Sequence, residues 1–173
     1  PRREVGIRSL FNVLGPLTNP AGANVQVLGV YDPALTSLLA EVLRRLGSTS
    51  AIVVFGEGSF DEISIVGPTQ VSELRNDTIT DYRVDPEEFG MARARLSDIT
   101  GGDAQENAAI VRQVLNGQPG ARRDMVLLNA GAAFYAAGKA SDMDEGIKIA
   151  ADSIDSGLAA EKLDQLIEGT NRD

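Results

Sequence analysis

The stretch VQVLGVYDPALTSLLAEVLRRLGSTSAIVVF, residues 25–55, decides the fold class of this chain. Two apolar runs, residues 25–30 and 51–55, flank a segment in which leucines recur at helical spacing. Asp32-Pro33 is typical of a helix start, and Gly47 is typical of the residue that follows the last turn. A strand, a helix and a strand in so short a stretch predict a right-handed βαβ unit with parallel strands. The second run is apolar throughout, which favours a strand buried on both faces.

Beyond this unit, the sequence predicts a small β excursion and then helices. The expected strands are residues 63–66, 70–74 and 78–82, joined by turns at Gly67-Pro68 and Asn76-Asp77. One helical turn is expected at 86–89 and a loop at 96–102. Asp103 and Glu106 have the spacing of a capping box, which predicts a helix ending at Gly117 with a buried stripe of Ile110, Val111, Val114 and Leu115. Three further helices are expected over 121–137, 142–155 and 158–168. The whole pattern predicts an α/β fold with a largely parallel sheet flanked by helices.

Composition limits the classes of function. The 173 residues fit one domain, 1–173, and contain no apolar run long enough for a membrane span. The sequence has no cysteine and no histidine, which excludes disulfides, an ordinary zinc site and a nucleophile activated by histidine. A formal net charge of −9 argues against a nucleic-acid surface. The pairs Arg44-Arg45 and Arg122-Arg123 have acids nearby and are interpreted as solvated helix faces.

Upstream, residues 8–20 read RSLFNVLGPLTNP. Pro16 and Pro20 fix φ and remove two backbone donors, while Gly15 permits conformations closed to other residues. This mixture predicts a rigid, non-periodic segment. Chemistry alone allows both an interdomain turn and a ligand-contacting segment, and it favours the turn.

The same stretch resembles the R-T-x-F-N-x-L-G-P-L-x-N-P signature of anthranilate phosphoribosyltransferases. Further matches cover essentially the whole chain, at residues 24–31, 60–62, 101–108, 127–130 and 145–146. The resemblance implies the C-terminal part of a nucleoside phosphorylase/phosphoribosyltransferase-type α/β domain, with residues 1–20 as an interdomain and substrate-pocket segment. The family's Gly-Thr-Gly-Gly-Asp phosphate loop and its Lys-His-Gly-Asn segment do not occur here. We therefore expect a C-terminal portion that is inactive on its own.

The resemblance also implies a reaction. Members transfer the phosphoribosyl group from phosphoribosyl pyrophosphate to anthranilate, with Mg²⁺, in tryptophan biosynthesis. It further implies a cytoplasmic protein that forms a homodimer through its N-terminal helical domain, with no nucleic-acid or membrane partner. Two alternatives stay open: a pyrimidine-nucleoside phosphorylase-like enzyme, and a non-catalytic homologue that binds nucleic acid.

Asp61-Glu62 is the candidate metal site. Of three adjacent acidic pairs, only this one follows a glycine-containing loop at the carboxyl end of a buried strand, where open parallel sheets bind ligands. Magnesium is held by one or two carboxylates together with water and substrate phosphates. The residues alone equally allow an acid pair that caps the following strand. In the resembled family the two acids hold magnesium bound to pyrophosphate. Phe55, Ser59 and Phe60 depart from the family's usual histidine, glycine and leucine.

The remaining candidates concern the aromatic substrate. The resemblance assigns Arg2 to the anthranilate side of the pocket, where a guanidinium can pair with a carboxylate or stack on a ring, although a terminal arginine can also be simply exposed. Gly15 and Pro16 would line the same pocket. Asn107 and Asn129 match family motifs, but helix-cap or interhelical hydrogen bonds are the favoured interpretation of both. No residue is assigned as catalytic.

Overall fold

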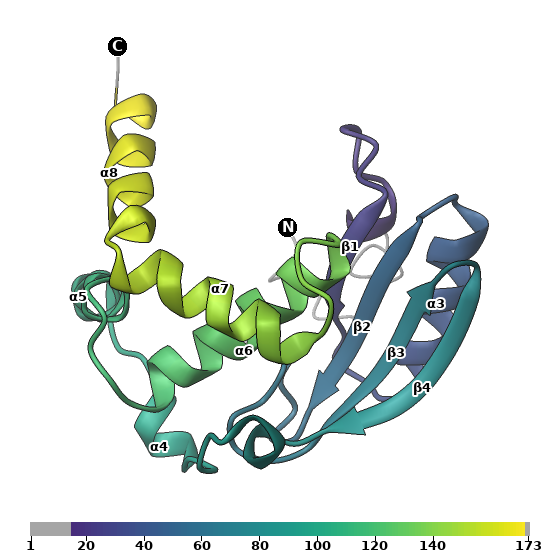
Figure 1. Ribbon diagram of the computed structural model, residues 1–173, viewed down its shortest axis with the longest axis horizontal. Helices are drawn as coiled ribbons and strands as arrows, with labels where there is room; N and C mark the ends of the chain where they lie inside the picture. The colour runs from purple at the N-terminus through teal and green to yellow at the C-terminus, as the bar shows by residue number, and fades with distance from the viewer. Residues whose placement is uncertain (1–14, 172–173) are drawn as a thin grey trace, which may run out of the picture.

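The computed structural model describes residues 15–171. Its centre is a four-stranded sheet in the order β1-β2-β3-β4 with helices on both faces (Figure 1). β1 (Val25–Gly29) and β2 (Ser50–Gly56) are parallel. β3 (Thr69–Arg75) and β4 (Thr78–Val84) continue the sheet in antiparallel pairings. The α/β class is confirmed, and the described sheet is mixed, because its second half is a hairpin that adds antiparallel strands to one parallel pair.

The first helix, α3 (Leu35–Arg45), joins the two parallel strands as the sequence predicts. It begins at Leu35 because Asp32 first closes a turn, in which its carboxylate accepts a hydrogen bond from the Ala34 N–H at 2.9 Å. Gly47 follows the helix with φ at 88°, a left-handed conformation that favours glycine. On the outer surface Glu41 pairs with Arg44 and Arg45, which confirms the solvated helix face.

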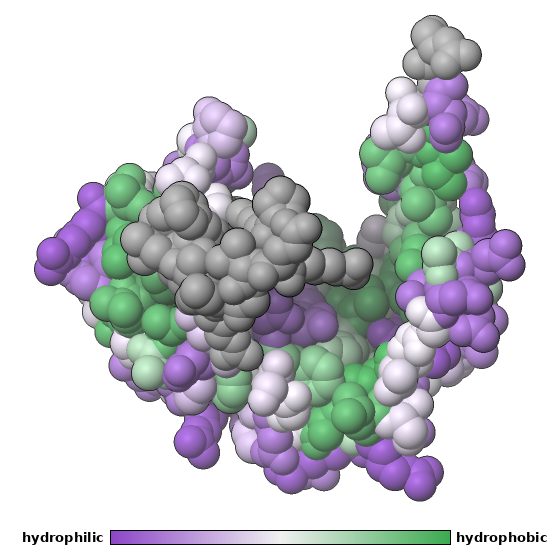
Figure 2. All heavy atoms as spheres, turned by 180° about the vertical axis from the view of Figure 1, so that it is seen from behind, coloured by the Kyte–Doolittle hydropathy of each residue, from purple (hydrophilic) through white to green (hydrophobic). Residues whose placement is uncertain are grey.

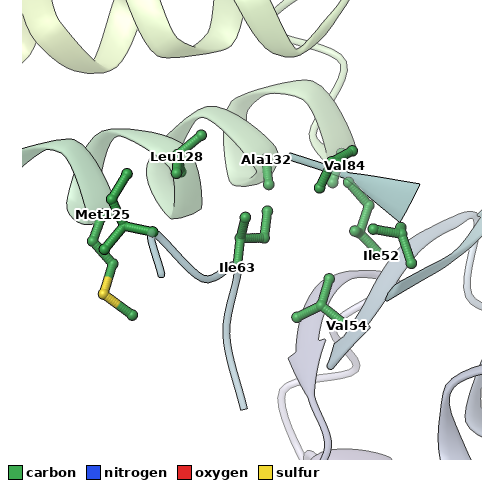
Figure 3. Close-up of a cluster of buried hydrophobic side chains, with 10 residues drawn as sticks. Ile52, Val54, Ile63, Val84, Met125, Leu128 and Ala132 are labelled. Atoms are coloured by element: carbon green, nitrogen blue, oxygen red, sulfur yellow. The ribbon is translucent and has the colours of Figure 1, made fainter. Parts of the chain in front are cut away.

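Two apolar layers hold the sheet. α3 covers one face, where Leu39 and Leu43 pack against Ala51 and Val53. α6 (Ala121–Ala136) covers the other face, where Leu128 packs in a cluster with Ile52 and Val54 (Figure 3). Alternate residues of β2 therefore enter opposite layers, and the prediction of a strand buried on both faces is confirmed.

Residues 63–66 are not a strand, and this prediction was wrong. Ile63 and Ile65 are buried, but the backbone of the segment pairs mainly with side chains instead of a neighbouring strand. The Ser64 N–H donates to Thr69 Oγ1 at 2.9 Å, and the Val66 N–H donates to Ser64 Oγ at 3.0 Å. The hairpin turn was predicted correctly, with Asn76 and Asp77 at φ of 50° and 60°.

The second half of the chain is helical, as predicted. Its elements are a 3₁₀ turn η1 (Pro86–Phe89), α4 (Leu96–Ile99), α5 (Ala104–Leu115), α6, α7 (Met143–Asp155) and α8 (Leu158–Thr170). α4 replaces part of the predicted loop, because the Asp98 carboxylate accepts a hydrogen bond from the Arg95 N–H at 3.0 Å and supports one helical turn. The capping box at α5 is confirmed: Asp103 accepts from the Glu106 N–H at 2.9 Å, and Glu106 accepts from the Asp103 N–H at 3.1 Å.

The stripe on α5 is less buried than the sequence predicted. Val114 is buried, Ile110 and Leu115 are half-buried, and Val111 is 46% exposed. The reason is that α5 packs against α7 and α8 along one side, while its other side lines an open groove. α8 extends away from the body of the molecule in Figure 1. No helix among the described residues has both the length and the apolar character needed to cross a bilayer.

Candidate functional site

The acid pair Asp61-Glu62 lies just beyond the carboxyl end of β2. The loop between Gly56 and Phe60 is closed by two backbone hydrogen bonds. The Gly56 N–H donates to the Phe60 carbonyl at 2.9 Å, and the Phe60 N–H donates to the Gly56 carbonyl at 3.2 Å. Gly58 and Ser59 both have positive φ, at 92° and 64°. The serine that replaces the family's usual glycine therefore adopts the left-handed conformation at a cost of about 1–2 kcal/mol.

Two strand glycines support this loop. A Cβ atom at Gly29 of β1 would overlap the backbone carbonyl of Asp61. One at Gly56 of β2 would lie 2.6 Å from the backbone oxygen of Glu62. The acid pair thus crosses the carboxyl ends of both parallel strands, the edge where the sequence predicted a ligand. Gly29 was not singled out in the sequence, although a glycine inside a strand run is a signal of close backbone approach.

Both carboxylates are exposed. Among residues 15–171, neither side chain forms an ion pair or accepts a hydrogen bond. Partial burial raises the pKa of Glu62, and the adjacent charge of Asp61 raises it further. Two neighbouring carboxylates that repel each other make a suitable site for a metal ion.

The number of ligands limits which metal fits. Within the described part of the chain, no group of three or more acidic, histidine or cysteine side chains could hold an ion. A metal that needs a complete protein cage would not fit such a site. Magnesium fits, because it takes one or two carboxylates and completes its shell with water and substrate phosphates.

α6 contacts the loop through Asn129. Its Oδ1 accepts a hydrogen bond from the Ile63 N–H at 2.8 Å, and its Nδ2 donates to the Ile63 carbonyl at 2.9 Å. The expectation of a helix-cap or interhelical contact was therefore wrong for Asn129, which joins a helix to the site loop. Asn107 does support a helix start: it makes the same two-bond contact with the backbone of Gly102, ahead of α5.

The substrate candidates lie only partly within the described residues. Arg2 falls outside residues 15–171. Residues 15–17 form a helical turn, which corrects the expectation of a non-periodic segment there; the φ of proline is also compatible with a helix. Gly15 is exposed, and Pro16 lines a small cavity that is also lined by Gly29. Pro16 and the acid-pair loop thus both lie near the carboxyl end of β1.

A mainly apolar groove of about 350 Å³ opens beside the loop. Glu62 lies on its border, and its walls come from α4, α5 and α6, including Ile99, Ile110, Val111, Val114 and Met125. Arg122 also borders the groove, where its guanidinium donates to the Thr100 carbonyl at 2.8 Å. Next to it, Arg123 pairs with Asp155 at 2.9 Å. Both arginines are half-buried, so the prediction of a solvated helix face was wrong for this pair, whose contacts join α6 to neighbouring segments.

Comparison with known proteins agrees with this geometry. Residues 1–160 match the model of the glycosyl transferase family, a/b domain. The chain is 54% identical over 171 residues to an anthranilate phosphoribosyltransferase of Geobacter sp. (strain M21), covering 99% of this chain and 49% of that protein. It is 56% identical over 170 residues to one of Thioalkalivibrio sulfidiphilus (strain HL-EbGR7), covering 98% and 50%. The chain thus spans about half the length of the curated relatives it matches.

Solved structures give the same result. The crystal structure of anthranilate phosphoribosyltransferase from Thermus thermophilus matches with a TM-score of 0.86 and 45% identity, covering 95% of this chain and 48% of that one. The Saccharomyces cerevisiae enzyme in complex with PRPP and Mg matches with a TM-score of 0.85 and 30% identity, covering 96% and 48%. The resemblance found in the sequence is confirmed. The chain belongs to the glycosyl transferase family, and residues 1–160 are a match to its a/b domain.

Proposed function

We propose that the full-length protein transfers the phosphoribosyl group of phosphoribosyl pyrophosphate to the amine of anthranilate, in tryptophan biosynthesis. The products are N-(5-phosphoribosyl)anthranilate and pyrophosphate. The observation that carries the proposal is the acid pair fixed across the carboxyl ends of β1 and β2, which forms no ion pair with any of residues 15–171. The names of the matched relatives support the choice of reaction and substrates.

Asp61 and Glu62 are the residues that would hold Mg²⁺. When bound, the ion supplies charge stabilisation for the pyrophosphate that leaves. The two carboxylates suit this task because they are exposed, adjacent and on a backbone that the two strand glycines keep in place.

The chemistry requires little else from side chains. The C1–O bond to pyrophosphate breaks, a C1–N bond to the anthranilate amine forms, and the amine loses a proton. The sequence contains no histidine or cysteine with which to build a nucleophile and its activating base. Binding, orientation and electrostatic stabilisation are therefore the contributions that we assign to this chain.

For the aromatic substrate we propose Arg2, with Gly15 and Pro16 as the wall of the pocket. A guanidinium can pair with the anthranilate carboxylate or stack on its ring. The cavity shared by Pro16 and Gly29 supports this assignment, because it puts the proposed wall near the strand end that carries the acid pair.

We further propose that residues 1–173 form one α/β domain, with 1–20 as the segment that contacts the other half of the protein. The protein would be cytoplasmic and homodimeric, and this chain alone would be inactive. Neither alternative gains support: the relatives described above are named anthranilate phosphoribosyltransferases, and a net charge of −9 disfavours nucleic-acid binding.

The test is an assay of the full-length protein with two reactions side by side. We expect loss of anthranilate fluorescence with phosphoribosyl pyrophosphate and Mg²⁺, and no phosphorolysis of uridine or thymidine by inorganic phosphate. Phosphorolysis without transfer to anthranilate would replace the proposed function with the phosphorylase alternative.

A further inference from the structure

We infer that Asn129 is a positioning residue for the acid pair: through its side-chain amide, α6 sets the orientation of the peptide that follows Glu62. The inference rests on the proposed function, since it concerns the metal site formed by Asp61 and Glu62. Asn129 touches neither acid side chain. Its partners are backbone atoms of Ile63, a residue 66 positions away in sequence.

The geometry fixes one peptide unit from two sides. The N–H that Asn129 accepts belongs to the peptide whose carbonyl is that of Glu62. That same carbonyl oxygen faces Gly56, where an added Cβ would approach to 2.6 Å. A planar peptide held at its N–H and confined at its oxygen cannot rotate freely. The backbone of Glu62, and with it the origin of its side chain, is therefore set by α6 and β2 together.

The side-chain amide of Asn129 is itself held in one orientation. Its Nδ2 donates a second hydrogen bond, to the Met125 carbonyl one turn earlier in α6, at 2.9 Å. The Ile63 side chain is buried in the same cluster as Leu128, so the loop and the helix are also joined by apolar packing (Figure 3). Only an uncharged group with both a donor and an acceptor can satisfy the Ile63 N–H and carbonyl simultaneously, which is why an amide suits this position.

A purely structural role predicts a different outcome from a positioning role. Loss of a buried hydrogen bond lowers stability wherever it occurs. Loss of a residue that orients a metal ligand also weakens metal binding, typically by about 10- to 100-fold. Ser72 offers a matched control. It is fully buried on β3 and hydrogen-bonds to Asp81 at 2.5 Å, on the face of the sheet that carries α3.

The experiment measures Mn²⁺ binding to the full-length protein by electron paramagnetic resonance, with phosphoribosyl pyrophosphate and without anthranilate, so that no turnover occurs. Asn129→Leu keeps a similar volume and removes the amide. Asn129→Gln keeps the amide one methylene further out. We expect Asn129→Leu to weaken Mn²⁺ binding by about 10- to 100-fold, Asn129→Gln to weaken it less, and Ser72→Ala to lower the Tm without changing Mn²⁺ affinity.

Unchanged Mn²⁺ affinity in both Asn129 variants, together with a lowered Tm, would overturn the inference and leave the proposed function standing. If Asn129→Leu does not fold, Asn129→Gln decides: wild-type affinity with a lowered Tm overturns the inference, and weakened affinity supports it. A wild-type protein that does not bind Mn²⁺ in this assay would overturn the metal site itself, and the inference with it.

Discussion

Gly29 is the residue on which the position of the acid pair depends most directly. It lies at the end of β1, and any side chain there would overlap the Asp61 carbonyl. A glycine inside a strand normally lowers folding stability slightly, because it adds backbone entropy to the unfolded state and has no side chain to pack. Here the missing side chain leaves the space through which the site loop passes.

Gly29→Ala in the full-length protein should therefore be destabilising. Replacing a strand glycine by alanine ordinarily stabilises by about 0.5–1 kcal/mol. In this case we expect a loss of about 1–3 kcal/mol, because the loop must move to relieve the overlap, and a lower transferase rate. Urea unfolding and the anthranilate assay measure the two effects.

Gly169→Ala is the matched control for this change. Gly169 lies in α8 with no heavy atom within 4 Å of an added Cβ. The alanine should be neutral or stabilise by up to about 1 kcal/mol and leave the rate unchanged. If Gly29→Ala behaves like Gly169→Ala, the loop does not depend on that glycine.

Arg2 should govern the aromatic substrate and leave the sugar phosphate unaffected. Removing one charge-assisted contact costs roughly 1.5–3 kcal/mol, or about 10- to 150-fold in anthranilate efficiency. Arg2→Ala in the full-length protein should raise the KM for anthranilate and leave that for phosphoribosyl pyrophosphate nearly unchanged. Equal increases in both constants would instead indicate that Arg2 holds the two halves of the protein together.

At the level of elements, the sequence predicted what local patterns determine. The βαβ unit, the hairpin turn at Asn76-Asp77 and the capping box at Asp103 each have a signal within a few residues. Residues 63–66 were wrongly assigned to a strand because an apolar run does not show what its backbone bonds to: here the partners are the side chains of Ser64, Thr69 and the distant Asn129. The same limit applies to the site. The acid pair could be found from a loop after a buried strand, but Gly29 and Asn129 act across long sequence separations that a local pattern does not contain.

The surface of α3 provides a pH-dependent test of this structure. Glu41 accepts hydrogen bonds from the guanidinium groups of Arg44 and Arg45. These bonds, with Arg44 contributing more, lower the pKa of Glu41 from 4.5 to about 2. The folded-state pKa lies below the unfolded one, so the contribution to stability is complete above about pH 4.5 and is lost as the pH falls toward about 2. Glu41→Gln should lower the Tm of the full-length protein at pH 7, and the difference from wild type should narrow below about pH 4.5. A difference that stays constant with pH would contradict the ion pairing.

At the scale of the whole molecule, apolar side chains of α8 are left open to solvent in the described part of the chain. Figure 2 shows hydrophobic side chains along α8, where Leu158 and Leu166 are 60% and 62% exposed. The fold class could be predicted from the sequence, but this openness could not, because helical spacing predicts an apolar face and not whether that face is covered.

The isolated chain should have no phosphoribosyltransferase activity. It lacks the glycine-rich run whose backbone amides would bind phosphates in the resembled family, so only one side of the site would be present. Anthranilate fluorescence in the presence of phosphoribosyl pyrophosphate and Mg²⁺ should stay constant with chain of verified mass. Sustained turnover would mean that this half builds a complete site.

The central claim is that Asp61 and Glu62 hold the metal that assists pyrophosphate loss. The most direct measurement is the Mg²⁺ dependence of the full-length transferase with Asp61→Asn and Glu62→Gln combined. We expect the rate at saturating substrates to fall by about 10²–10³ with a weakened Mg²⁺ dependence. The unfolding free energy should change by no more than about 0.5 kcal/mol, because both side chains are exposed. Near-normal turnover with an unchanged Mg²⁺ dependence would contradict the claim.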